Sequence, residues 1–477
     1  RTPRRPLARL HAHHARIESG ELAVGDTVKL AIDVARRDAI RANHSATHLL
    51  HAALRNRLGG HVTQKGSLVA PDRFRFDFSH PSALTAQEIA EIETDVNSEI
   101  RPNEAVSTRL LTPADAVAAP PPIIVPPDNP DAAVVFDLKI SKDIPLSGQD
   151  RFDAVSEPIT RGLYQSAYSA KENAIYVTAA IGRPPVTQSE LIKVDADTLK
   201  IEARITPARI PGHDDNRVYA VYGVAVDDVN GNVWVTNTRD NTVAVYRQSD
   251  LKLVKQFEAG AVPHGRDVIV DGERGRVYAS SVEEPKIAVF DARTLQKLPD
   301  IEIASGVRGE KFSPMSLDLD RSTGKLFTVS ISTSETAVID GVSGRTEKVI
   351  ALTNAASASG VAWDSDTKRL LVASQGSDNL LIVDPVSGNI VHDVYVGNGA
   401  LNVVYDPVIK LAFVSNRGAG TVTAVDASGR IVANLEAGTL PNHLHDDGRG
   451  HVYSVNKSRG AEDPRGDRLT RFSLKSK

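Results

Sequence analysis

The sequence predicts a mainly β fold, a seven-bladed β-propeller preceded by a small, incomplete α+β domain. The first observation is a repeated pattern, in which a turn residue leads into an apolar strand and then a polar loop. The copies recur every 40 to 58 residues, as expected when each copy forms one blade. The second observation is that the N-terminal residues carry no such repeat. The repeated strands centre on Tyr176, Trp234, Tyr278, Phe327, Leu371, Phe413 and Tyr453.

The N-terminal domain, assigned to residues 1–117, starts with one strand signal and one helix signal. Val24–Val34 alternates apolar and polar residues like a strand. Asp38–Leu58 has apolar residues at helical spacing, and Gly59 is placed to end that helix.

A second strand and a second helix follow in the same domain. Arg73–Ser79 alternates, with three phenylalanines on one face and charged residues on the other. Thr85 and Glu88 form a capping box ahead of a helix that runs through Ile100. The phenylalanine face needs a partner layer, so we expect residues 1–117 to be less stable than the repeats.

A proline-rich segment, residues 118–131, reads as a semi-rigid linker to the propeller, assigned to residues 132–477. Within the repeats, Asn230–Gly231 suits a hairpin turn. The last copy, which starts at His443, offers three clear strands. We expect Val134–Ile140 to supply its fourth strand and so close the ring.

Composition limits the partners and the chemistry. The chain has 477 residues, with 56 Lys plus Arg, 60 Asp plus Glu and no cysteine. The near-zero net charge favours neither a nucleic-acid nor a membrane partner, and no apolar run of about 18 residues is present. Without cysteine there is no disulfide, thiolate zinc site or cysteine nucleophile. The first residues carry no signal peptide as written, which favours a cytoplasmic location.

Histidines four apart mark the N-terminal helix. His44 and His48 fall on one helix face, with His51 one turn further on. Two neutral imidazoles at this spacing can hold one zinc ion. The same spacing also occurs among histidines with no ligand role, so a metal site and a structural role both stay open.

The sequence around these histidines, Asn43–His80, resembles the editing region of alanyl-tRNA synthetases, and the likeness runs from about Gly20 to Val117. The resemblance implies hydrolysis of mischarged tRNA with a bound zinc ion. It matches His44 and His48 to two zinc ligands and Gln64 to an editing-pocket residue. The family's later Cys-x-x-x-His half has no counterpart here, because the chain has no cysteine. The resemblance therefore implies a truncated, catalytically incomplete editing region.

In the propeller, the loops that enter the inner strands are the candidate ligand site. Such loops ring the mouth of the central channel, where polar groups distant in sequence converge. Ordinary turn chemistry is the alternative explanation for these residues. Asp318–Lys325 fits a hairpin turn better than a calcium loop. The candidate ligand-binding residues are His264, Arg266, Asn402, His443 and His445.

The repeat region resembles the YVTN-repeat, YncE-like family of seven-bladed propellers. The matching words are Gly162–Thr178, which contains the strand Tyr176–Thr178, and Pro441–Lys457. The resemblance implies binding of single-stranded nucleic acid and a periplasmic location as the alternative compartment.

These observations favour a binding or interaction protein, with a ligand or nucleic acid at the channel mouth and a catalytically incomplete synthetase-like segment. The alternative is a zinc-dependent aminoacyl-tRNA editing hydrolase, or an alanine-tRNA ligase-related protein, with an accessory propeller and tRNA as partner. A third class, a propeller enzyme with a lactonase-type metal site, requires carboxylates at equivalent blade positions. The sequence shows no such set.

Overall fold

The chain divides into two compact units, Arg1–Lys139 and Ile140–Lys477. The predicted linker at 118–131 and both of its boundaries lie outside the residues that the structure describes, so that division stays a prediction. The predicted strand before Val34 lies outside them as well. The computed structural model describes residues 4–7, 10–12, 34–59, 61–70, 73–80, 84–100, 144–182, 184–213, 215–460 and 462–475.

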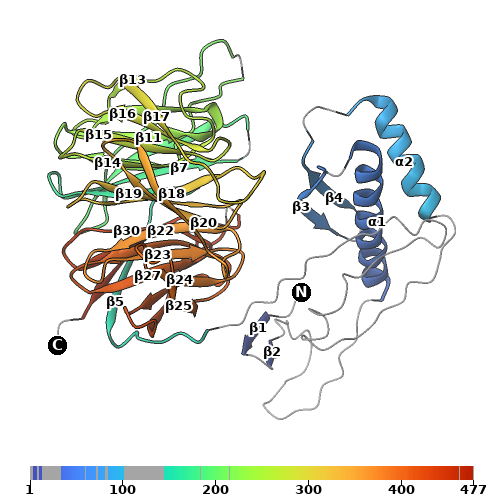
Figure 1. Cartoon of the computed structure of the whole chain (residues 1–477). Helices are drawn as coiled ribbons and strands as arrows, with labels where there is room; N and C mark the ends of the chain where they lie inside the picture. The colour runs from blue at the N-terminus through green and yellow to red at the C-terminus, as the bar shows by residue number, and fades with distance from the viewer. Residues whose placement is uncertain are drawn as a thin grey trace. The chain divides into compact units, whose positions relative to one another are not determined.

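The described residues of the first unit form two helices and two small antiparallel sheets (Figure 1). The predicted helices and the phenylalanine strand are confirmed. No helix in the described part of the chain is both long and apolar enough to cross a membrane. The elements are β1 (Arg4–Leu7), β2 (Leu10–Ala12), α1 (Val34–Leu58), β3 (Gln64–Val69), β4 (Phe74–Phe78) and α2 (Ala86–Ile100).

Local signals fix the C-terminal end of α1 and the N-terminal end of α2. Gly59 has a φ of 111°, and its N–H donates to the Arg55 carbonyl at 2.9 Å, which ends α1. The predicted capping box starts α2. The Thr85 N–H donates to Glu88 Oε2 at 2.7 Å, and the Glu88 N–H donates to Thr85 Oγ1 at 3.2 Å.

The core of the first unit lies between the helices and the β3–β4 sheet. Its buried apolar side chains in the described residues are Ala53, Leu54, Val62 and Ile92, and Phe76 and Phe78 pack against them. The phenylalanine face therefore finds its partner layer on the helices.

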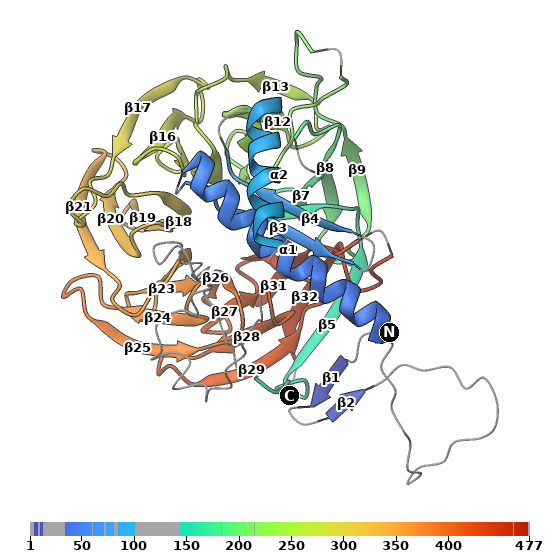
Figure 2. The same ribbon diagram turned by 90° about the vertical axis from the view of Figure 1, so that its right-hand side faces the viewer.

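The second unit is a propeller of seven four-stranded antiparallel sheets, arranged in a ring (Figure 2). Blade 1 comprises β6 (Leu163–Ser169), β7 (Ala174–Ile181), β8 (Gln188–Asp195) and β9 (Ile201–Ile205). Blade 2 comprises β10 (Val224–Asp227), β11 (Asn232–Asn237), β12 (Thr242–Arg247) and β13 (Leu253–Gln256). Blade 3 comprises β14 (Gly265–Asp271), β15 (Arg276–Ser281), β16 (Lys286–Asp291) and β17 (Lys297–Glu302).

The remaining blades continue in chain order. Blade 4 comprises β18 (Pro314–Asp320), β19 (Lys325–Ser330), β20 (Glu335–Asp340) and β21 (Arg345–Ala351). Blade 5 comprises β22 (Ala358–Asp364), β23 (Arg369–Ser374), β24 (Asn379–Val383) and β25 (Ile390–Tyr395). Blade 6 comprises β26 (Ala400–Asp406), β27 (Leu411–Asn416), β28 (Thr421–Val425) and β29 (Ile431–Glu436). Blade 7 comprises β30 (Pro441–Asp446), β31 (His451–Asn456), β32 (Arg468–Leu474) and β5 (Phe152–Pro158).

The ring closes by strand exchange, but the exchanged strand differs from the predicted one. β5 pairs antiparallel with β32 from Phe152 opposite Leu474 to Pro158 opposite Arg468. Val134–Ile140, predicted for this place, lies outside the described residues, and the place is taken by Phe152–Pro158. Only four residues, Ile159–Gly162, separate β5 from the first inner strand β6, too few for an intervening blade strand. The predicted closure by strand exchange is therefore confirmed, whereas the prediction that Val134–Ile140 is the exchanged strand was wrong.

The repeated centres are the buried second strands of the blades. Three of the centres are tyrosines that also bond to the next blade round the ring. Tyr176, Tyr278 and Tyr453 donate their hydroxyls to the carbonyls of Gln248, Gly341 and Ala196, at 3.0, 2.9 and 3.3 Å. These bonds join each tyrosine to the turn that follows the third strand of its neighbour, so the repeated aromatic stabilises the contact between blades.

Candidate functional site

One end of the propeller, which we call the top face, collects two kinds of loop. Every blade has the same order of strands, and each inner strand contacts the next round the ring, so all seven inner strands begin at this end. These strands are β6, β10, β14, β18, β22, β26 and β30. Because strands within a blade alternate in direction, the loops from second to third strands reach the same face. Residues at the starts of inner strands and just after second strands therefore meet round one channel mouth.

A ring of hydrogen bonds crosses from blade to blade near this mouth. In five blades, a side chain of the inner strand accepts a backbone N–H from the next inner strand, whose edge otherwise lacks a partner. The pairs are Gln165 Oε1 with Val224 N (3.1 Å), Asp267 Oδ2 with Leu317 N (2.9 Å), Ser316 Oγ with Val361 N (2.8 Å), Asn402 Oδ1 with Leu444 N (2.9 Å) and His443 Nδ1 with Ser166 N (3.4 Å).

Glycine occupies the equivalent position in the other two blades. A Cβ on Gly360 would lie 2.8 Å from the Asn402 Cα, and one on Gly223 would lie 2.9 Å from the Arg266 carbonyl oxygen. The neighbouring backbone thus approaches too closely for any side chain at these two places.

This ring changes the interpretation of three predicted ligand residues. Asn402 and His443 lie near the mouth as expected, but Asn402 Oδ1 and His443 Nδ1 already accept backbone N–H groups of the neighbouring blades. His445 lies deeper, where its Nδ1 is 2.8 Å from Ser166 Oγ and its ring stacks on Tyr453 at 4.9 Å. Burial lowers the pKa of His445 to about 3 and that of His443 well below its ordinary value. Both histidines are therefore neutral at physiological pH and support the fold.

Three cationic side chains surround one tyrosine at the mouth, and we call Arg266, Arg417, Lys457 and Tyr164 the cationic cluster. Arg266 Cζ lies 4.7 Å and Lys457 Nζ 3.9 Å from the centre of the Tyr164 ring. Arg417 Nη1 donates to Asn442 Oδ1, and Asn442 Nδ2 donates to the Tyr164 carbonyl at 2.6 Å. Arg266 was predicted as a ligand residue; Arg417, Lys457 and Tyr164 were not.

The members of the cluster come from separate blades. Tyr164 is the second residue of β6 and Arg266 the second of β14, whereas Arg417 and Lys457 directly follow β27 and β31. Tyr222, just before β10, packs edge-on against Tyr164 with ring centres 4.8 Å apart. Four blades supply the cluster and a fifth supports it.

The electrostatics of the cluster favour an anion. Burial, then Arg417 and Arg266, lower the pKa of Lys457 to about 7; Arg239 acts in the same direction and Asp467 opposes it. Burial and Arg266 also lower the pKa of Arg417. Arg266 Nη1 is buried without a hydrogen-bond partner among the described residues. Positive charge is crowded here, and an open donor remains.

His264, the remaining predicted residue, sits at the rim. It directly precedes β14, and its Nδ1 lies 3.4 Å from Glu283 Oε1. Burial lowers its pKa, with Arg239 and Arg266 acting in the same direction and Glu283 opposing them. Its imidazole is therefore neutral near pH 7 and adds no charge to the cluster.

Two carboxyl groups lie further along the inner strands. Burial raises the pKa of Asp446 to about 7 and that of Asp318 to about 6, with Asp406 and Asp267 respectively among the carboxylates that add to the shift. Asp318 lies in β18, while the turn after it is held by Asp320, which accepts from Ser322 Oγ at 2.6 Å.

The described residues contain no group of three or more His, Asp or Glu side chains that could hold a metal ion.

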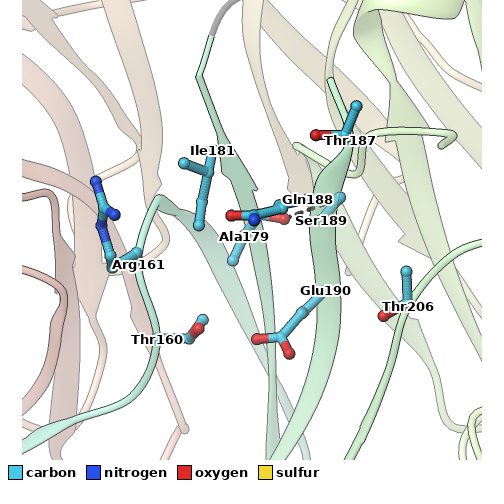
Figure 3. Close-up of a pocket in the computed structure, with 9 residues that line it drawn as sticks. All are labelled: Thr160, Arg161, Ala179, Ile181, Thr187, Gln188, Ser189, Glu190 and Thr206. Carbon is cyan, nitrogen blue, oxygen red and sulfur yellow. Dashed lines mark hydrogen bonds between the residues drawn. The ribbon is translucent and has the colours of Figure 1, made fainter. Parts of the chain in front are cut away.

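A separate pocket of about 260 Å³ lies on blade 1 (Figure 3). Ser189 Oγ donates to the Ala179 carbonyl at 2.8 Å within it, and Glu190 lies 3.7 Å from Arg204. The pocket shares no residue with the cationic cluster. Its lining is Thr160, Arg161, Ala179, Ile181, Thr187, Gln188, Ser189, Glu190 and Thr206.

In the first unit, the structure brings His44 and His48 together. Their Nε2 atoms are 3.1 Å apart, so one ring donates to the other. Burial lowers the pKa of His48, and His44 and His51 act in the same direction. His51 turns toward Phe76, with ring centres 5.1 Å apart, and is not part of the pair.

A second histidine pair was not predicted. His61 Nε2 lies 3.0 Å from His80 Nδ1, and the two residues flank the β3–β4 hairpin. The pairing of Gln64 with Phe78 in that hairpin brings the flanks together. Of its two strands, only the second, at Arg73–Ser79, was predicted from the sequence. Gln64 begins β3; its side chain lies outside the described part of the structure.

Comparison with curated proteins identifies a synthetase-like segment. The chain is 76% identical over 115 residues to the alanine–tRNA ligase of Sphingopyxis alaskensis, covering 24% of this chain and 13% of the ligase. It is 45% identical over 217 residues to the ligase of Rhizorhabdus wittichii, covering 43% of this chain and 24% of the ligase. The predicted resemblance to this family is confirmed for a segment. The chain spans at most a quarter of either ligase.

Solved structures confirm the propeller. A streptogramin B lyase matches with a TM-score of 0.53 at 11% identity, over 69% of this chain and all of that one. The virginiamycin B lyase of Staphylococcus aureus matches with a TM-score of 0.52 at 13% identity, over 68% of this chain and all of that one. At such identities the likeness shows the fold alone. No protein-family model matches the sequence, and the YVTN-repeat assignment stays a prediction.

Proposed function

We propose that the propeller is a binding module that takes an anionic ligand at the cationic cluster, in a chain that also carries an alanyl-tRNA synthetase-like segment. The observation that carries the proposal is that Arg266 and Lys457 lie against the Tyr164 ring and Arg417 reaches the same residue through Asn442, with one guanidinium donor left open. Guanidinium groups pair with carboxylate and phosphate oxygens through parallel hydrogen bonds. An anion relieves the mutual repulsion of the cations that the lowered pKa of Lys457 reports.

Phosphate groups of single-stranded nucleic acid are one source of such an anion. Aromatic rings beside basic groups suit stacked bases and backbone phosphates together, and Tyr164 and Tyr222 supply the rings. Binding of this kind weakens steeply as salt rises.

The test is calorimetric titration of the full chain with inorganic phosphate, and separately with a single-stranded oligonucleotide at two salt concentrations. The double variant Arg266→Gln/Arg417→Gln is expected to weaken binding at least about tenfold, or about 1.4 kcal/mol. The matched control is Arg293→Gln, an exposed arginine in the turn after β16. Equal affinity of the double variant and the natural chain would exclude this site.

A second candidate function, zinc-dependent editing of aminoacyl-tRNA, is favoured by the His44–His48 pair. Two zinc–nitrogen bonds of about 2.0–2.1 Å at a tetrahedral angle place the nitrogens roughly 3.3 Å apart, close to the observed 3.1 Å. The lowered pKa of His48 keeps it neutral, as a ligand must be. The described residues supply two ligands where a catalytic zinc needs about three, so no catalytic step follows from them.

Metal analysis of the purified full chain tests this second candidate. About one zinc per chain is expected, and His44→Ala/His48→Ala should abolish it, whereas His392→Ala on the propeller should not. A metal-free natural chain, prepared in zinc-supplemented buffer, removes the editing proposal.

A further inference from the structure

We propose that Lys457 is a nucleophilic amine, which forms a Schiff base with a small carbonyl compound carrying an adjacent carboxylate, such as a 2-oxo acid. The proposal rests on the cationic cluster being the ligand site proposed above, and it names the substrate class and the reacting atom of that site.

The position of Lys457 first separates it from an ordinary surface lysine. It directly follows β31, and its backbone N–H donates to the Leu440 carbonyl at 3.1 Å, which anchors the loop. Its ammonium nitrogen lies 3.9 Å from the Tyr164 ring centre and makes no ion pair within 4.0 Å to a carboxylate of the described residues. The amine is thus held against an aromatic face without a counter-ion in contact.

The charges around the amine favour its neutral form. The groups that face it from the packed elements are Arg417 after β27, Arg266 in β14, Arg239 between β11 and β12, and Asp467 before β32. Asp467 is turned toward backbone groups, because its Oδ1 accepts from the Gly162 N–H at 2.9 Å. Three cations thus oppose protonation and one carboxylate supports it.

The consequence is a lysine that is nucleophilic near neutral pH. Its pKa is about 7, so about half of the amine is unprotonated at pH 7, against less than about 0.1% for a lysine with the ordinary value near 10.4. Desolvation together with neighbouring cations is an established way to activate a lysine toward carbonyl carbon.

The same arginines define what the carbonyl compound must carry. Arg266 has a free buried donor at Nη1, and Arg266 and Arg417 both lie close enough to lower the pKa of Lys457. When a carboxylate pairs with one of these guanidinium groups, the carbonyl carbon next to it is held near the Lys457 amine. A neutral ketone lacks that anchor.

The reaction is a condensation without oxidation or reduction. The Nζ lone pair forms a bond to the carbonyl carbon, and the carbonyl oxygen takes up a proton to give a carbinolamine. Loss of that hydroxyl with a second proton as water leaves a carbon–nitrogen double bond. One water is released for each Schiff base formed.

The experiment treats the full chain with pyruvate and sodium borohydride, which reduces the imine to a stable secondary amine, and maps the modified residue by peptide mass spectrometry. We expect one modification per chain at Lys457, with a yield that rises as the pH passes about 7. The variant Lys457→Arg should lose it. Arg266→Gln should reduce it at least about tenfold, and acetone in place of pyruvate should fail to label.

The control is Lys368→Arg, because Lys368 is an exposed lysine that also lies over an aromatic ring, 5.9 Å from Trp363; it should leave the labelling unchanged. Labelling spread over exposed lysines, or equal yields with acetone, overturns the inference. Binding of inorganic phosphate without trapping at Lys457 overturns this inference alone. Loss of both overturns the binding site as well.

Discussion

Some polar side chains near the channel accept hydrogen bonds from the backbone of a neighbouring strand, and others keep a donor without a partner. Asn402 and His443 are residue types that often bind ligands, yet they accept N–H groups from neighbouring inner strands. Arg266, the second residue of the inner strand β14, keeps a free donor. The sequence predicted that these residues meet at one mouth. It did not predict their roles, because the partner of each lies in another blade.

The ring of bonds gives a stability prediction at Asn402. Asn402→Ala leaves the buried Leu444 N–H without its partner, and we expect a loss of about 1–3 kcal/mol in the free energy of unfolding. Urea titration measures it, with Asn389→Ala at an exposed position as control. Equal loss in both variants contradicts the role assigned to the ring.

Asp446 gives a prediction about pH. Its pKa is about 7 in the folded chain against about 3.9 when unfolded, so the folded state holds the extra proton between these values. Its contribution to stability is therefore present below about pH 4 and is lost as the pH rises to 7. Asp446→Asn mimics the protonated form and should stabilise the chain at pH 8 by on the order of 1 kcal/mol or more.

Thermal unfolding of Asp446→Asn and the natural chain at pH 4 and pH 8 checks this. The difference should shrink at pH 4, where Asp446 of the natural chain is protonated when folded and about half protonated when unfolded. A variant that is no more stable at pH 8 shows that the carboxylate is well solvated.

The strand that closes the ring shows that local alternation can predict a strand without predicting which blade it joins. Alternation marked strands throughout the repeats, and the short final copy indicated a missing fourth strand. Phe152–Pro158 and Val134–Ile140 both carry apolar residues able to fill that place. The choice depends on which segment reaches β32 just before the chain enters β6, and that distance is a property of the closed ring.

A cross-link across the closure tests its contribution. Ser156 and Thr470 are opposite each other in β5 and β32, with their hydroxyl oxygens 2.8 Å apart. In this cysteine-free chain, Ser156→Cys/Thr470→Cys offers one disulfide. It closes a very long loop, so we expect about 2–4 kcal/mol of stabilisation. The melting temperature should rise under oxidising conditions and return with a reductant, and Ser156→Cys alone should show no such dependence.

At the scale of the molecule, the two units differ in their cores. The described part of the first unit has four buried apolar side chains in its core, whereas each propeller blade shares a buried cluster with its neighbours. Burial of apolar area is the main stabilising term, so the first unit should unfold at lower free energy.

Limited proteolysis measures this difference. Protease should remove the first unit before it cuts the propeller, and mass spectrometry should find a resistant fragment that contains Phe152–Leu474. Equal rates of cleavage in both units would contradict the expectation.

Periodic patterns along the sequence sufficed to predict the seven blades, the two helices with their caps and the His44–His48 pair, because each depends on spacing over a few residues. The cationic cluster depended on folding. Tyr164, Arg266, Arg417 and Lys457 belong to four blades, and nothing in their local sequence connects them. Closure of the ring by β5 brings the first and last blades together, and so places Lys457 against Tyr164.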